Sequence, residues 1–149
     1  MSDTRELLQA NRLILCHFDS YSTALVFARW PDGSLLAPAP LPATASLVEA
    51  PAELASVHAA QPVCAAGIAQ LALDEAELVY VGDFDAWAAS EEGLIRIHLL
   101  RFTNFEAPAH RIEGAGGVFR PISALRGAAA IELPLVRKVF DLIMGGGGR

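Results

Sequence analysis

The sequence predicts one α+β domain, in which a mixed or mainly antiparallel sheet of two hairpins packs against helices. Strand-like apolar runs flank turn signals at Pro31–Gly33 and Ser90–Gly93. Leu133–Met144 instead has helical spacing. With 149 residues, 53% apolar and a mean hydropathy of +0.37, the chain is long enough for one core and too short for two. The predicted domain spans residues 1–144, and Gly145–Arg149 is a flexible Gly-rich tail.

In the amino-terminal third, Thr4–Asn11 is typical of a short helix, and Arg12–Phe18 has the apolar density of a buried strand. A second strand, Ser22–Trp30, is rich in residues that favour strands and runs into a Pro-Asp-Gly turn. The pattern therefore predicts that Leu35 and Leu36 return as the second arm of a hairpin.

The middle of the chain contains a loop followed by two predicted helices. Four prolines make Pro38–Pro51 a loop or an extended edge, because each removes a backbone donor. Helices are predicted at Pro51–Ala60 and from Pro62 to about Leu73. Leu54–Leu73 carries no charge and has the length of a membrane span, but its polar residues and many alanines exclude that reading.

The second hairpin is the clearest local pattern in the sequence. Leu78–Ala88 and Leu94–Thr103 are strand-like, and a polar turn separates them. Side chains alternate along a strand, so Arg96 and His98 share one face, and the apolar residues between and beside them point to the other.

The carboxy-terminal third ends in a strongly apolar helix. A short helix at Glu106–Gly114 and a strand at Val118–Ile122 are predicted first. The final helix, Leu133–Met144, has an apolar arc wider than one core-facing stripe, so we expect it to be deeply buried or covered by a partner. Three of its residues are predicted to be almost wholly buried: Val136, Phe140 and Ile143.

The best polar cluster in the sequence is carried by the second hairpin. Asp83 and Asp85 lie on one strand face, and Arg96 and His98 lie on one face of the next strand. The four side chains form either a set of cross-strand charge pairs or a ligand site for a small anion, with Arg101 as a further candidate.

The cysteines and histidines predict no metal site and no cofactor. Adjacent Cys16 and His17 point to opposite faces of a strand, so they cannot form a nucleophile and base pair. Cys16 and Cys64 both fit buried structural positions, and the four histidines lack metal-binding spacing. Two cysteines and an amino terminus without an apolar signal core favour the reducing cytoplasm.

The charge of the chain is unevenly distributed. Ten carboxylates and no Lys or Arg lie between Arg29 and Arg96, whereas eight basic and four acidic residues lie from Arg96 to Arg149. The two segments are either solvated separately, or they meet within one chain or across a dimer, or the basic residues leave an electropositive spot for an anionic ligand. A net charge of -6 and a pI of about 5.1 argue against nucleic-acid binding through a broad basic surface.

The order of elements from Pro31 onward resembles that of a Nudix domain. The likeness rests on layout and covers PDGSLL, the helix PVCAAGIAQLAL, the hairpin LVYVGDFDAW and LIRIHLLRF, FRPISAL and the terminal helix. The family's box, with its metal-binding carboxylates, is missing, because the helix has no acidic residue before Asp74. The resemblance implies a mixed sheet between helices and a domain that has lost the family's hydrolase chemistry.

Two function classes follow from these observations. The first is a non-catalytic binding or regulatory domain of a small cytoplasmic homodimer, because the sequence lacks a recognisable catalytic constellation and is highly apolar. The alternative is an enzyme or ligand-binding protein that acts on a small anionic, nucleotide-like molecule. Convergence of the candidate residues in a concavity would favour the alternative.

Overall fold

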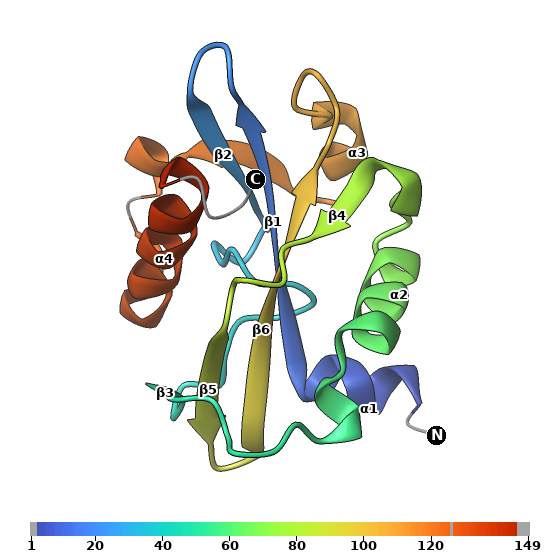
Figure 1. The fold of residues 1–149 in the computed structure, drawn as a ribbon, viewed down its shortest axis with the longest axis vertical. Coiled ribbons are helices and arrows are strands. Elements are labelled where there is room, and N and C mark those ends of the chain that lie inside the picture. Colours follow the sequence, from blue (N-terminus) through green and yellow to red (C-terminus); the bar gives the residue numbers. More distant parts are fainter. Residues whose placement is uncertain (1–2, 126, 146–149) are drawn as a thin grey trace.

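The computed structural model describes residues 3–125 and 127–145, and within them seven strands form one mixed sheet (Figure 1). The strands are β1 (Asn11–Asp19), β2 (Ala24–Arg29), β3 (Ser46–Val48), β4 (Leu78–Tyr80), β5 (Ala86–Ser90), β6 (Gly93–Phe102) and β7 (Val118–Pro121). The helices are α1 (Thr4–Gln9), α2 (Ala60–Gln70), α3 (Ala109–Gly114) and α4 (Leu133–Met144). The predicted α+β class is confirmed.

The sheet has the strand order β3-β5-β6-β1-β2-β7. β4 also pairs with β6, along the carboxyl-terminal part of β6 that β5 does not reach. β1 and β6 are parallel neighbours, with Leu13 opposite His98 and His17 opposite Phe102. The other named pairs are antiparallel. The parallel pair therefore lies near the middle of the sheet, and both of its strands run toward the same edge.

The two hairpins are β1-β2 and β5-β6, so one predicted hairpin is wrong. Leu35 and Leu36 form no strand; instead they are buried beside α4, and Ala37 makes a single bridge to Leu13. β2 already has strands on both sides, β1 and β7, and the returning chain packs onto a face of the sheet. These leucines are apolar because they fill the core.

The predicted strand Leu78–Ala88 is interrupted between β4 and β5. Phe84 inserts into the core at this break, and its amide donates to the Val81 carbonyl in a turn. Asp83 and Asp85 therefore lie in the break and not on one strand face, which corrects the sequence-based placement. A buried aromatic anchor thus divides what reads as one apolar run.

The predicted helix Pro51–Ala60 is also wrong, because the segment contains only the 3₁₀ turn Ser56–His58. Half of its side chains are exposed and only His58 is buried, so no continuous apolar face is buried that would stabilise a longer helix. The next predicted helix is present as α2. No helix among residues 3–125 and 127–145 is long and apolar enough to cross a membrane.

Two apolar cores lie on opposite faces of the sheet. One contains Leu7 of α1, Val63 of α2 and Ile112 of α3, and the other contains the inner face of α4 (Figure 1). Cys16, predicted to be a core residue, has no exposed surface and lies on the α4 side.

Helix α4 has the predicted bounds, but its burial is only partly as predicted. Val136 and Ile143 are buried, whereas Phe140 is 38% exposed and lies on the outer side of the helix. The apolar arc is too wide for a single contact with the sheet, so part of it faces outward. Beyond Gly145, the predicted tail lies outside the described residues.

Candidate functional site

The five predicted site residues do not meet in one concavity. Arg96 and His98 lie together on the face of β6 that α2 covers, as the strand alternation predicts. Asp83 is exposed, and the carboxylate of Asp85 accepts a hydrogen bond from Trp87 Nε1 at 2.7 Å. Arg101 contacts Phe18 near the end of the sheet. The structure thus defines two regions, one around His98 and one around Arg101.

His98 is fully buried at the centre of a chain of hydrogen bonds. The side-chain nitrogen Nδ2 of Asn11 donates to the carbonyls of Leu7 and Val57, each at 2.8 Å. The side-chain oxygen Oδ1 of Asn11 therefore accepts from Nε2 of the buried His98, at 2.8 Å. The other ring nitrogen, Nδ1, then accepts from the Tyr80 hydroxyl at 2.8 Å. Both ring nitrogens of a neutral imidazole are satisfied.

This chain of hydrogen bonds is a structural network and not a proton relay. Burial, with a smaller contribution from Arg96, lowers the pKa of His98 to about 3. Burial raises the pKa of the Tyr80 phenol, an effect that Arg96 opposes and that Cys64 and Asp85 reinforce. Transfer of the phenol proton to the imidazole is therefore strongly unfavourable. The network instead ties α1, β1, β4 and β6 together.

Arg96, near the amino-terminal start of β6, contacts the Ser56–His58 turn that precedes α2. Its Nη1 atom donates to the His58 carbonyl at 3.0 Å, and its guanidinium lies 5.4 Å from the centre of the Trp87 ring. The His58 ring packs edge-on against Trp87 at 5.0 Å. Arg96 Nε and His58 Nδ1 are buried there without a hydrogen-bond partner. Arg96 is therefore used in packing η1, the Ser56–His58 turn, against the sheet.

The second region is a cavity of about 340 Å³ at the carboxyl ends of β1 and β6. Because these strands are parallel and pair up to His17 and Phe102, they end together, and the loops that follow both line the cavity. Its principal lining residues are Phe18, Tyr21, Val79, Arg101, Asn104 and Phe105. The volume is within the usual range for small-molecule sites.

Aromatic side chains line the cavity together with Arg101, the one cationic side chain of its lining. The Arg101 guanidinium lies 5.9 Å from the centre of the Phe18 ring. Tyr21 and Phe105 are 84% and 76% exposed, and their ring centres are 5.7 Å apart. Large apolar side chains at that exposure contribute little to the core, so their placement at a cavity mouth points to a ligand-facing role.

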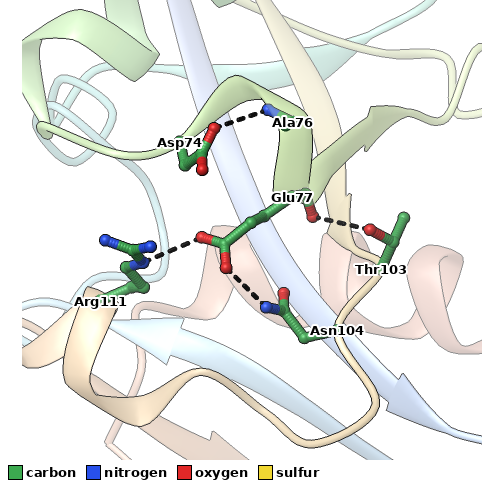
Figure 2. Close-up of polar contacts among 6 residues, drawn as sticks. All are labelled: Asp74, Ala76, Glu77, Thr103, Asn104 and Arg111. Carbon is green, nitrogen blue, oxygen red and sulfur yellow. Dashed lines mark hydrogen bonds and ion pairs between the residues drawn. The ribbon is translucent and has the colours of Figure 1, made fainter.

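The loop after β6 is held in place by Glu77, as Figure 2 shows. The Glu77 carbonyl accepts from the Thr103 amide at 2.8 Å and from its hydroxyl at 3.2 Å. The Glu77 carboxylate accepts from Asn104 Nδ2 at 2.7 Å. Its other oxygen lies 2.9 Å from Arg111 Nε, as an ion pair without hydrogen-bond alignment. Arg111 and Glu77 are one place where the acidic and basic segments of the sequence meet.

The loop is fixed from the opposite side by His17, and the β1-β2 loop is fixed by Asp19. Nε2 of the buried His17 ring donates to the Asn104 carbonyl at 2.8 Å. The Asp19 carboxylate accepts from the amides of Tyr21, at 2.9 Å, and Ser22, and these hydrogen bonds lower its pKa. Both loops that line the cavity are therefore fixed by hydrogen bonds within the chain.

The sequence analysis named Arg101 as a candidate but placed it with the hairpin cluster, and it did not single out Tyr21, Asn104 or Phe105 of the cavity, or Glu77 beside it. The available signal was a single aromatic residue in the polar loop after each of two predicted strands. That signal becomes informative only when the two strands are known to be parallel neighbours.

Another cavity, of about 380 Å³, lies between β3, β5 and the start of α4. Asp85 lines it together with Leu47, Leu135 and Lys138. Lys138 Nζ donates to the Asp85 carbonyl and lies 5.8 Å from the Phe84 ring centre. The lysine is thus part of the packing between α4 and the break in the sheet.

Within residues 3–125 and 127–145, no three His, Cys, Asp or Glu side chains are close enough to hold a metal ion. No protein-family model and no curated protein matches the chain. The resemblance to Nudix domains therefore stays a prediction. The helix at the position of the Nudix box is α2, which has neither Asp nor Glu.

Proposed function

We propose that this protein is a non-catalytic binding domain whose ligand is a small anion with a flat ring, a nucleotide-like molecule. The proposal rests on the cavity at the paired ends of β1 and β6, where Arg101 is flanked by Phe18 and where Tyr21 and Phe105 lie exposed. Open α/β sheets commonly bind ligands beyond the carboxyl ends of parallel strands, since the loops that follow those strands meet there.

The side chains of the cavity match the two parts of such a ligand. A guanidinium binds carboxylate or phosphate oxygens through paired donors, and exposed aromatic faces stack on a planar ring. Arg101 has a further interaction within the chain besides Phe18, so the ligand shares or replaces that contact. Asp19 adds a negative charge to the lining of the cavity.

Three observations support binding over catalysis. Burial raises the pKa of Cys16 to about 12 and that of Cys64 to about 11, so neither thiol is a thiolate at neutral pH. His98 is buried and occupied at both nitrogens. The Nudix-like layout, with a box helix that lacks carboxylates, agrees with a domain that does not use that family's metal chemistry.

We further propose that the chain acts as a homodimer in the cytoplasm. Leu133 is 50% exposed, and Phe140 and Met144 are 38% and 39% exposed, all on α4. Exposed apolar residues on one element favour a protein contact. Cys16 and Cys64 are both free, which fits a reducing compartment.

Isothermal titration calorimetry with uridine 5′-monophosphate tests the binding proposal. We expect the wild-type chain to bind this probe at least about tenfold more tightly than uridine or inorganic phosphate, because each of these offers half of the contacts. Arg101→Gln is expected to weaken probe binding by about tenfold or more, since it removes a charge-assisted contact. Phe105→Ala should weaken it several-fold.

Arg120→Gln provides the matched control, because Arg120 is exposed on β7 and lies outside the cavity lining. Its affinity for the probe should equal that of the wild type. Equal binding by Arg101→Gln would contradict the proposal. So would a wild-type chain that does not bind the probe at about 10 mM. Turnover of the probe would favour the enzyme alternative.

A further inference from the structure

The apolar arc of helix α4 continues beyond its buried face. Leu135, Val136, Val139 and Ile143 are buried against the sheet. A second, outward stripe is formed by Leu133, Arg137, Phe140 and Met144, all of which are exposed. Their spacing of four, three and four residues places them along one line of the helix surface. We call these four residues the outer stripe.

The outer stripe is symmetric about its own midpoint. When a second α4 is laid antiparallel on the first with a two-fold axis at that midpoint, Leu133 meets Met144 of the second copy, and Arg137 meets Phe140 of the second copy. The apolar contact between Leu133 and Met144 forms twice, once at each end of the helix pair. The contact between Arg137 and Phe140, a cation over an aromatic ring, also forms twice.

The charges beside the outer stripe follow the same symmetry. Asp141 lies beside it, about 40° around the helix from Arg137 and about one turn further along. In the antiparallel pair, the same flanks of the two helices meet, which brings Asp141 beside Arg137 of the second copy. A parallel pair would instead place Arg137 against Arg137 of the second copy at the same height, and these like charges repel.

We propose that the outer stripe of α4 is the surface through which two copies of this chain associate, antiparallel and with Arg137 facing Phe140 and Asp141 of the second copy. This inference rests on the proposed homodimer and adds its surface and orientation. A pair of three-turn helices buries little area, so we expect a weak dimer with a dissociation constant on the order of 10–100 µM. Apolar contacts supply the affinity, and the charges set the orientation.

Cysteine cross-linking in the full chain tests the orientation. Leu133→Cys and Met144→Cys are combined in a Cys64→Ser background, since Cys16 is buried. The two new cysteines are about 16 Å apart along one helix, so they cannot pair within a chain. Under mild oxidation the double variant should form covalent dimers. Each single variant should remain monomeric, because equivalent residues lie at opposite ends of the antiparallel contact. Cross-linking of either single variant to itself would overturn the antiparallel arrangement.

Sedimentation equilibrium tests the surface itself. Leu133→Lys should weaken self-association by tenfold or more, and Leu54→Lys should leave it unchanged, since Leu54 is similarly exposed at 56% but lies outside α4. Arg137→Asp and Asp141→Arg should each weaken the dimer, and the double variant should regain only the part of the affinity that comes from the charge pair, because the cation over Phe140 is lost. Circular dichroism and the thermal midpoint show whether each variant is folded.

The possible failures are distinguishable. A wild-type dimer that Leu133→Lys leaves intact would overturn the α4 surface, while the homodimer would stand. A wild-type chain that is monomeric at about 200 µM, in low and in high salt, would overturn the homodimer and the surface together. Neither result bears on the cavity at Arg101, which lies wholly within one copy.

Discussion

Replacement of Glu132 by alanine is expected to lower the free energy of unfolding by about 3–5 kcal/mol. The Glu132 side chain is 1% exposed, just before α4. It accepts from the Ser34 hydroxyl at 2.6 Å and from the Leu35 amide at 2.9 Å. Truncation leaves both donors buried without a partner and detaches the segment after β2 from the start of α4. Urea unfolding monitored by circular dichroism measures the loss.

Glu113→Ala is the control for this prediction, because Glu113 is exposed on α3, and its replacement should change stability by less than about 0.5 kcal/mol. The loss of unfolding free energy in Glu132→Gln should lie between those of Glu132→Ala and Glu113→Ala. In glutamine one carboxyl oxygen is replaced by an NH₂ group, which would face another hydrogen-bond donor. A loss below about 1 kcal/mol in Glu132→Ala would show that the fold does not depend on this contact.

The stability of the wild type is expected to fall as the pH is lowered below about 6.5, because of His98. The folded imidazole stays neutral down to about pH 3, whereas the unfolded imidazole takes up a proton near pH 6.5. Between these values the unfolded state binds more protons, so stability decreases with decreasing pH by up to about 1.4 kcal/mol per unit. Above pH 6.5 the histidine is neutral in both states and contributes no pH dependence.

His98→Gln isolates this contribution. Glutamine does not titrate, and its amide can accept from Tyr80 and donate to Asn11 in place of the two ring nitrogens. The difference in unfolding free energy between wild type and variant should therefore shrink by about 2–3 kcal/mol between pH 6.5 and 4.5, since the other titrating groups are common to both. Parallel curves across this range would mean that folded His98 is protonated like an ordinary histidine.

The elements that the sequence predicts correctly are those whose pattern depends on local spacing. The bounds of α4 follow from helical periodicity, Pro134 and Gly145, and the alternation in β6 places Arg96 and His98 on one face. Local patterns fail where an apolar residue is buried for a tertiary reason. Leu35 and Leu36 read as a strand because they are apolar, but they are buried in the core that also contains the inner face of α4.

The candidate site could not be assembled from the sequence, because it depends on which strands are neighbours. Tyr21 and Phe105 are far apart in the chain, and they meet only because β1 and β6 pair in parallel. Asp83 and Asp85 show the opposite error. Their spacing suggests a shared strand face, yet Phe84 between them enters the core and breaks the strand. Composition gives no sign of either event.

Amide chemical shifts of the ¹⁵N-labelled full chain, titrated with uridine 5′-monophosphate, test the central claim most directly. We predict saturable shifts concentrated at the ends of β1 and β6, from Phe18 to Ser22 and from Arg101 to Glu106, and their loss in Arg101→Gln. Small or absent shifts there at saturation, with the largest changes beside the cavity between β3 and α4, would contradict the proposed binding site.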